Sequence, residues 1–342
     1  MNDVNTIIDK TPMGLYLQDK HPIRDGVKYA QLAEDCGFKQ VWQAESRLAR
    51  ESTIPLAAIA TVTDRIHLGT GVASMWTRNI GLLGATFSTL NELAPGRIKA
   101  GLGAWWDPLA SKVGVNRTRP LKVMREVVIN LRKLFNMENV TFKGEFVKID
   151  GIELDIVHGE RKPLPIPLYI GATGDKMLKL SGEIADGVLL NYLVSPLYNK
   201  KALKLIEEGA RKSNRKLEDI DRPQLVVVSL DDDGDLAINR ARELVTQYLG
   251  QQPHIGKASG VPADLLEEVG KILTWPATPE QIKKAMELVP DETVQLVAAA
   301  GIEEDCRAKV AEFIKDGCTC PIMYPLADDP EKMIKAFAKT TE

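Results

Sequence analysis

Glycines and large aromatic residues recur at the predicted ends of strands, and both kinds of residue suit a flat cofactor. The stretch "YIGATGDK" (169–176) places two glycines three residues apart between an apolar run and a helical pattern. Glycine lets a backbone approach a ligand closely, and free N–H groups at a helix start attract a phosphate. Aromatic side chains stack on planar rings. The residues concerned are Gly69, Gly71, Gly101, Gly103, Gly171 and Gly174, with Trp76, Trp105, Trp106 and Tyr192. They predict a site for a flat cofactor that carries a phosphate.

Each of these signals also has a plainer interpretation. Single glycines at strand ends often only mark turns. The tryptophans could belong to a core, and Asp175 could be the N-cap of the helix that follows. The pattern as a whole, rather than any one residue, therefore carries the prediction.

Motifs for several other chemistries are missing from the sequence. There is no G-x-S-x-G nucleophile turn, no Walker P-loop and no H-E-x-x-H zinc motif. Cys318 and Cys320 form only a C-x-C pair, which lacks the spacing of a zinc site, so we expect no metal. The acidic residues that follow predicted strands are Asp19, Glu45 and Asp107.

Apolar runs alternate with amphipathic segments along the chain, as in a parallel sheet covered by helices. The runs lie at 13–18, 39–44, 65–72, 97–103, 166–171, 186–191, 223–230 and 320–326. Eight such units predict a closed (β/α)8 TIM barrel, whose strand C-terminal ends face the active site. An open doubly wound sheet is the alternative, but "LQDKHP" after the first run is not the phosphate fingerprint that it needs.

We predict one domain over residues 1–342 with two insertions, near 137–163 and 250–290. The first alternates apolar and polar residues with glycines at turns, which predicts a small β segment. The second is a long segment between helices and is either a lid or binding loop, or an oligomer contact or decoration. "VQLVAAAG" (294–301) is ambiguous between a ninth strand and the end of a helical insertion.

Composition excludes several classes of protein. The 342 residues carry a formal net charge of −3, with 44% hydrophobic and 27% charged residues, an ordinary globular balance without a nucleic-acid footprint. The first residues do not resemble a signal peptide, and no run of 18 apolar residues occurs, so we expect no membrane partner. Four cysteines in a chain of this length favour a reduced, cytoplasmic protein.

Two stretches resemble a known family. "RIHLGTGVASMWTRNIGLLGATFSTLNELAPGRIKAGLG" (65–103) is similar to the third and fourth units of the bacterial-luciferase-like superfamily. "YIGATGDKMLKLSGEIADGVLLN" (169–191) is similar to the coenzyme F420-dependent methylenetetrahydromethanopterin reductases within it. The resemblance extends over nearly the whole chain and implies a (β/α)8 barrel that binds F420 or FMN.

The resemblance implies roles for particular residues. Residues 69–72 would form a bulge against the cofactor ring, often with a non-prolyl cis peptide, and residues 171–176 would hold the cofactor phosphate. The predicted cofactor-binding residues are Gly69, Thr70, Gly71, Val72, Gly103, Gly171, Ala172, Thr173, Gly174, Asp175 and Lys176. The predicted substrate-binding residues are Trp76, Trp105, Trp106 and Asn191. Basic residues that either meet an anionic F420 tail or form a solvated surface are Arg47, Arg50, Arg78, Lys112, Arg117 and Arg119.

The chain departs from the family pattern at three acidic positions. It has Glu45-Ser46 where family reductases commonly carry Asp-His. It has Tyr16 where the methanopterin reductases carry Glu, and Ala104-Trp105 where they carry Asp. Glu45 is therefore the predicted catalytic acid or base.

The resemblance implies an F420-dependent oxidoreductase that moves a hydride between the deazaflavin and a small organic or pterin-type substrate. One alternative is an FMN-dependent monooxygenase, and another is a non-catalytic flavin-binding protein. We expect a homodimer or a homotetramer, as is usual in this superfamily.

Overall fold

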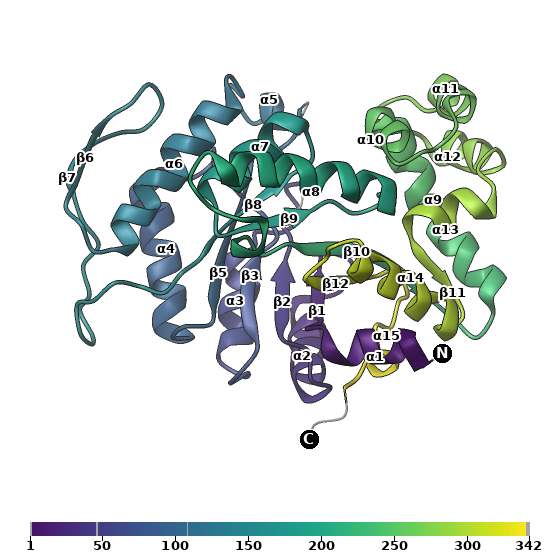
Figure 1. Cartoon of the computed structure of the whole chain (residues 1–342), viewed down its shortest axis with the longest axis horizontal. Coiled ribbons are helices and arrows are strands. Elements are labelled where there is room, and N and C mark those ends of the chain that lie inside the picture. The colour runs from purple at the N-terminus through teal and green to yellow at the C-terminus, as the bar shows by residue number, and fades with distance from the viewer. Residues whose placement is uncertain (1, 46, 108, 340–342) are drawn as a thin grey trace.

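Parallel strands close into a barrel in this computed structural model, which describes residues 2–45, 47–107 and 109–339. Around the ring each strand pairs with its neighbours, and β10 pairs with β9 to close it (Figure 1). The eight ring strands of the described chain are β1 (Gly14–Leu17), β2 (Gln40–Gln43), β3 (His67–Thr70), β5 (Ile98–Gly103), β8 (Leu168–Ala172), β9 (Gly187–Leu190), β10 (Pro223–Leu230) and β12 (Cys320–Pro325). Each corresponds to one predicted run, so the predicted barrel is confirmed.

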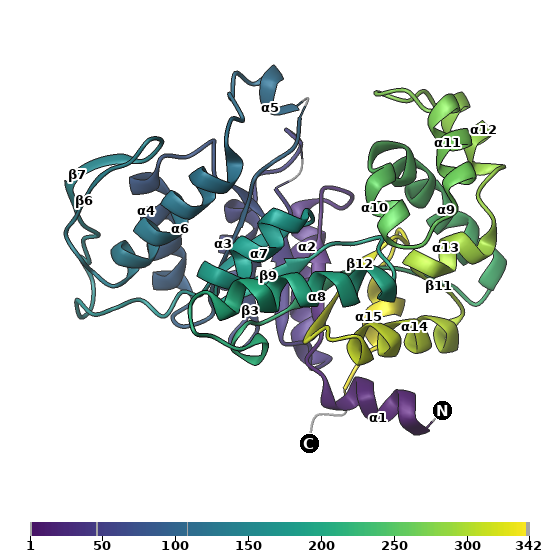
Figure 2. The same cartoon turned by 45° about the horizontal axis from the view of Figure 1, so that its top comes forward.

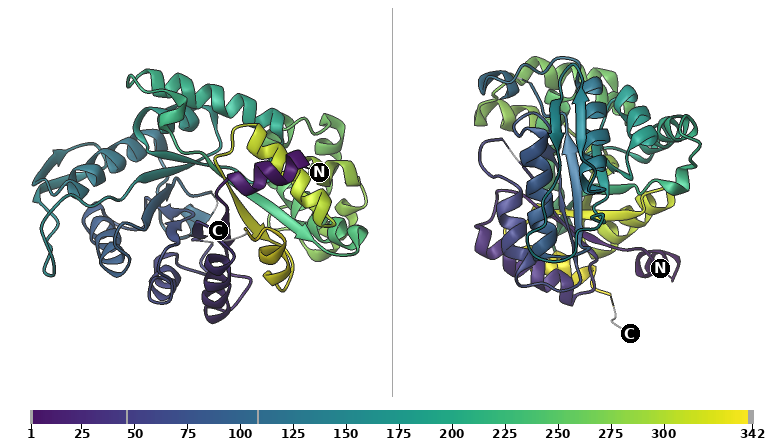
Figure 3. Two further views of the ribbon diagram at one scale, coloured as in Figure 1. Left: turned by 60° about the horizontal axis from the view of Figure 1, so that its bottom comes forward. Right: turned by 90° about the vertical axis from the view of Figure 1, so that its left-hand side faces the viewer.

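Helices cover the outside of the barrel (Figure 3). They are α2 (Ile23–Asp35), α3 (Thr53–Ala60), α4 (Ile80–Leu93), α6 (Pro120–Phe135), α7 (Asp175–Ile184), α8 (Pro196–Arg211), α14 (Glu303–Lys315) and α15 (Glu331–Ala336). Short elements complete this part, namely β4 (Ala73–Ser74), α5 (Leu109–Lys112) and the 3-10 helix η1 (Leu217–Asp219). No helix of the described chain is long and apolar enough to cross a membrane.

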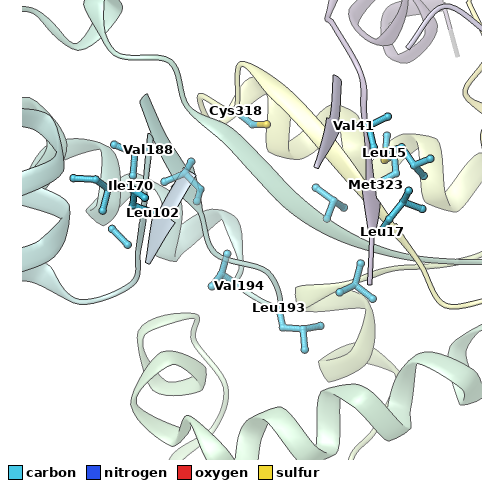
Figure 4. Close-up of a cluster of buried hydrophobic side chains, with 14 of the residues drawn as sticks. Leu15, Leu17, Val41, Leu102, Ile170, Val188, Leu193, Val194, Cys318 and Met323 are labelled. Carbon is cyan, nitrogen blue, oxygen red and sulfur yellow. The ribbon is translucent and has the colours of Figure 1, made fainter. Parts of the chain in front are cut away.

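Alternation along the strands divides the buried side chains into two layers. Leu15 and Leu17 of β1 face the helices and join the large outer cluster, part of which is drawn in Figure 4. Tyr16 between them faces the barrel interior. The interior cluster consists of Tyr16, Trp42, Ala44, Tyr169, Leu189 and Ile322, with Val72, Leu225 and Tyr324 packed against it. The interior is therefore rich in aromatic residues.

Side chains in the N-terminal half of the barrel interior pack around Lys99. The Lys99 ammonium lies 5.0 Å from the ring centre of Tyr169 and 6.0 Å from that of Trp42, within cation–π range. It also lies 2.9 Å from the Tyr169 hydroxyl and 3.5 Å from the Asp221 carboxylate. Burial alone would raise the pKa of Asp221, but Lys99, together with hydrogen bonds from Thr319 and Tyr169, holds it below its ordinary value. This cluster closes the N-terminal end of the barrel.

The first predicted insertion forms a hairpin at one edge of the molecule (Figure 1). Strands β6 (Val140–Lys143) and β7 (Lys148–Ile152) pair antiparallel, as the alternating sequence predicts. The carboxylate of Glu126 on α6 accepts backbone N–H bonds from residues 145–147 in the hairpin turn. One buried side chain thus ties the hairpin to the barrel helices.

The second insertion is a group of helices at the opposite edge (Figure 1). The predicted bounds near 250–290 contain α10 (Pro253–Ala258), α11 (Ala263–Ile272) and α12 (Pro279–Met286), and the group also includes the flanking helices α9 (Gly234–Gln251) and α13 (Asp291–Val297). The ambiguous stretch 294–301 is both a helix end and a strand, because α13 is followed by β11 (Ala299–Gly301), which pairs with β10 outside the ring. Helix α1 (Asn2–Lys10), which the sequence analysis did not predict, precedes the barrel.

Candidate functional site

Val72 occupies a cradle of glycines at the C-terminal end of the barrel. The peptide bond between Gly71 and Val72 is cis, as the family resemblance implies. A Cβ added to Gly103 would overlap the Cγ2 methyl of Val72, and one added to Gly171 would lie 3.0 Å from its Cγ1. Glycine at 103 therefore leaves the room that this side chain needs, and glycine at 171 avoids a tight contact with it. Val72 itself is half-buried, so part of its surface stays open at the mouth of the barrel.

The hydroxyl of Thr70 replaces part of the strand pairing beside this cradle. Its Oγ1 donates to the carbonyl of Gly101 at 2.6 Å and accepts from the N–H of Gly101 at 3.0 Å. A Cβ on Gly101 would overlap the carbonyl oxygen of Thr70. A Cβ on Gly69 would overlap the ring of Trp42. The glycines of β3 and β5 thus allow close backbone and ring packing, and Thr70, which is fully buried, supports the strand ends from within the barrel wall.

The loop after β8 leads directly into the N-terminus of α7. Ala172 is the last residue of β8 and is buried, whereas residues 173–176 are exposed. Gly174 precedes the helix with φ −88°, and nothing lies within 4 Å of a Cβ built on it. The Asp175 carboxylate forms an ion pair at 2.8 Å with Lys201 of α8. The helix start therefore offers N–H groups to open space, and Lys176 stands beside them.

The predicted tryptophans lie in the loops after β3 and β5. Trp76 donates through Nε1 to the carbonyl of Ala104 at 2.9 Å, which links the two loops. Trp105 has φ +54°, a left-handed conformation that is uncommon outside glycine and is found often at functional sites. Trp106 packs edge-on against Trp275, with ring centres 4.7 Å apart. This contact joins the loop after β5 to the helical insertion, whose helices α11 and α12 rise on the same side as α5 (Figure 2).

Tyrosines line the other side of the mouth. The Tyr16 hydroxyl donates to the carbonyl of Gly71 at 2.6 Å, and the Tyr324 hydroxyl donates to Gln18 at 2.7 Å. The ring of Tyr324 lies 5.4 Å from that of Tyr16 and 6.2 Å from that of Tyr192. The sequence analysis did not assign Tyr324 to the site, although strand alternation places it on the same interior face as Ile322. It also missed Tyr248 of α9, whose ring packs 4.9 Å from Tyr192, and no local pattern could have revealed that contact.

Asn191 belongs to a buried amide network behind these tyrosines. Its Nδ2 donates to the Tyr248 hydroxyl, and its backbone carbonyl accepts from Gln224 at 3.3 Å. Gln224 and Asn199 exchange two further amide hydrogen bonds, at 2.7 and 3.2 Å, and both are fully buried. The Asn191 side chain is thus engaged within the protein at the rim of the site.

Glu45 is held in a network of charges at the rim. Its two carboxylate oxygens accept from Arg78 at 3.1 and 2.9 Å. They also accept from the Ser52 hydroxyl and the Ser74 N–H. Arg78 pairs at the same time with Glu51. Glu45 therefore joins the loops after β2 and β3, close to residues 69–72. Ser46, which follows it, lies outside the described residues.

Other predicted basic residues also have partners within the protein. Arg47 pairs with Asp19, and Arg50 donates to two backbone carbonyls of the loop after β1. Arg117 pairs with Asp107. Arg119 pairs with Glu145 of the hairpin turn, while Lys112 is exposed. Most of this charge is therefore neutralised locally. Within the described ranges, no three His, Cys, Asp or Glu side chains gather as a metal site.

The chain resembles characterised proteins along most of its length. It is 31% identical to a 5,10-methylenetetrahydromethanopterin reductase of Archaeoglobus fulgidus, over 91% of this chain and 92% of that protein. It is 30% identical to an F420-dependent glucose-6-phosphate dehydrogenase of Beutenbergia cavernae, over 72% of this chain and 76% of that protein.

A solved structure supports the same relationship. The coenzyme F420 dependent tetrahydromethanopterin reductase from Methanopyrus kandleri superposes with a TM-score of 0.85 at 25% identity, covering 96% of this chain and 97% of that chain. A sequence model described as luciferase-like monooxygenase matches residues 6–320. The predicted family resemblance is confirmed, and this chain belongs to the luciferase-like monooxygenase family.

Proposed function

We propose that this protein is a coenzyme F420-dependent oxidoreductase, which transfers a hydride between the deazaflavin and a small organic or pterin-type substrate. The observation that carries the proposal is the match, over nearly the whole chain, to the F420-dependent reductase of Methanopyrus kandleri. The relative in Beutenbergia cavernae, which is also F420-dependent, supports the same cofactor.

The mouth of the barrel fits such a cofactor. The half-buried Val72, fixed between Gly103 and Gly171, offers a flat apolar surface for a ring. The open N-terminus of α7, with Thr173, Gly174 and Lys176 beside it, suits a phosphate. When bound, F420 would supply the hydride chemistry, and the protein would orient the ring and exclude water.

The remaining predicted residues have proposed roles that follow from their positions. Trp76, Trp105 and Trp106 would form the substrate wall on the side of β3 and β5, and Asn191 would act at the opposite rim. Glu45 remains the proposed acid or base. Because its two carboxylate oxygens bind Arg78, its loss would also loosen two loops of the mouth.

Anoxic turnover tests this proposal. Reduced F420 would be mixed with the protein and a panel of acceptors, namely methylenetetrahydromethanopterin, aldehydes and ketones, and the return of F420 absorbance would be followed. Parallel samples with reduced FMN and oxygen would measure product oxygenation. We expect F420 oxidation with at least one acceptor. Oxygenation with FMN but no turnover with F420 would instead favour the monooxygenase alternative.

We further propose a homo-oligomer that uses the outer faces of α3 and α4. Helix α3 contains no charged residue, yet Ile54 on it is 67% exposed, and Leu82 on α4 is 57% exposed. Exposed apolar faces of this kind mark interaction surfaces. Light scattering should give a dimer or tetramer, which Ile54→Asp with Leu82→Asp should dissociate. A monomeric wild-type protein would contradict this.

A cytoplasmic location is also part of the proposal. The four cysteines are unpaired, and three of them are buried. Free thiols of this kind are typical of proteins in a reducing compartment.

A further inference from the structure

Tyr192 belongs to a group of four tyrosines at the barrel mouth, which also contains Tyr16, Tyr248 and Tyr324. It follows directly after β9, and its ring packs between those of Tyr248 and Tyr324. The hydroxyls of Tyr16, Tyr324 and Tyr248 all have hydrogen-bond partners. Within the described part of the chain, the Tyr192 hydroxyl has none. Tyr192 follows the C-terminal end of β9 and is partly exposed, so a ligand in the mouth of the barrel can reach its side chain.

The position of Tyr192 is fixed from behind. The carbonyl of the preceding residue, Asn191, accepts from the buried Gln224, and the Asn191 side chain holds the Tyr248 hydroxyl. The following residue, Leu193, has φ +52° and is buried. Backbone on both sides of Tyr192 is therefore constrained, as expected of a group that meets a ligand in a set orientation.

Two acidic side chains near the mouth are already engaged. Glu45 is bound by Arg78, and Asp19 is paired with Arg47. His21 packs against Tyr29 of α2, and His67 lies at the start of β3, at the opposite end of the barrel. Within the described residues the buried Nε2 of His21 also has no partner, but its ring packs against Tyr29 of α2, whereas Tyr192 packs within the tyrosine group of the mouth. The Tyr192 phenol is thus an available neutral donor at the C-terminal end of the barrel.

We propose that the Tyr192 hydroxyl contacts the reacting carbonyl oxygen of the substrate and donates the proton that accompanies hydride transfer. The inference rests on the proposed function. Bound reduced F420 would supply the hydride, with its two electrons, that the carbonyl carbon accepts. The C=O π bond breaks, the Tyr192 O–H bond breaks as its proton forms the new O–H bond, and solvent returns a proton to the phenolate. The products are an alcohol and the oxidised cofactor.

The surroundings of Tyr192 agree with this role and narrow the substrate class. Burial raises the pKa of Tyr192 to about 12, so the phenol is protonated at neutral pH. The ring of Tyr192 packs against two neutral aromatic rings, those of Tyr248 and Tyr324. The site therefore suits a small neutral carbonyl compound. Reduction of a methylene-pterin also consumes a proton, but that proton goes to the nitrogen that the methylene bridge leaves as the iminium forms, so no carbonyl oxygen has to be protonated.

Tyr192→Phe tests the inference, with Tyr29→Phe as the matched control, because Tyr29 lies on α2 outside the barrel mouth. The first readout is F420 binding to the apoprotein, followed by fluorescence. The second is calorimetric binding of cyclohexanone to protein loaded with oxidised F420, in which no turnover can occur. The third is turnover with reduced F420, with cyclohexanone and with methylenetetrahydromethanopterin.

We expect both variants to bind F420 as the wild type does. Tyr192→Phe should weaken cyclohexanone binding about three- to tenfold, the effect of one lost hydrogen bond. It should lower ketone turnover by about 10²–10⁴-fold, the usual contribution of a general acid, and leave any turnover of the iminium substrate nearly unchanged.

Two results would overturn the inference while the proposed function stands: F420 binding without ketone binding in the wild type, or equal ketone reduction by Tyr192→Phe and wild type. Equal losses on both substrates would also overturn it, since they would reveal a structural role. Failure of the wild type to bind F420 would overturn the proposed function as well.

Discussion

Adding one methyl group to Gly103 should disturb the cofactor platform, because that position faces Val72. A Cβ there would overlap the Cγ2 methyl and lie 3.3 Å from the Cβ of Val72. Val72 has little freedom to move away, since β-branched side chains are stiff and Gly171 closes its other side. Overpacking of this kind costs about 1–3 kcal/mol.

The strain in Gly103→Ala can appear in two places. If the protein retains its native packing, the loss of stability lowers the melting temperature by roughly 1–4 °C for a chain of this length. If Val72 instead moves into the space that the deazaflavin ring would occupy, the same free energy weakens F420 binding by about 5- to 150-fold. Differential scanning fluorimetry and F420 fluorescence titration measure the two effects separately.

A second substitution tests whether the effects of Gly103→Ala come from contact with Val72. Val72→Ala removes both γ carbons, so the double variant with Gly103→Ala should be less impaired than the sum of the two single variants, by about 0.5–3 kcal/mol. Gly270→Ala is the control, because an added Cβ there meets nothing within 4 Å and the residue lies in exposed α11. It should stabilise by about 0.5–1 kcal/mol and leave F420 binding unchanged. Strictly additive effects of the Gly103 and Val72 changes would refute the proposed contact between these two positions.

Two further predictions concern charged groups. Glu45→Gln should lower turnover and change F420 affinity little. It should also cost about 1–3 kcal/mol of stability, because Arg78 keeps only Glu51 as a charged partner. Unchanged turnover in a steady-state assay would remove Glu45 from the mechanism. The pKa of Asp221 is lowered in the folded protein beside Lys99, so its contribution to stability is present above its unfolded value near 3.8 and is lost as pH falls through the folded pKa. Below about pH 4, the free energy of unfolding measured in urea should therefore fall more steeply with decreasing pH in the wild type than in Asp221→Asn. Parallel curves of this free energy against pH would contradict the linkage.

The strands could be read from the sequence because each is a short apolar run bounded by turn residues. Alternation within a run also places Tyr16 inside the barrel and Leu15 outside it. Helix α1 has only nine residues, and its apolar face consists of Val4, Ile7 and Ile8, so its pattern is too short to predict a helix.

Contacts between distant segments could not be read in this way. The pairing of Glu45 with Arg78 joins residues 33 positions apart, and no local spacing encodes it. The contact of Trp106 with Trp275 depends on how a helical insertion folds back over the barrel. The sequence identified residues suited to a cofactor site, but it could not reveal which of them the protein already uses for its own packing.

The central claim is that the mouth of this barrel binds F420, and titration of the apoprotein tests it most directly. F420 and FMN would be added in separate fluorescence titrations, with Gly103→Ala measured in parallel. The account predicts saturable F420 binding that this variant weakens, and no saturable FMN binding over the same concentration range. Saturable binding of FMN alone, or of neither compound, would contradict it.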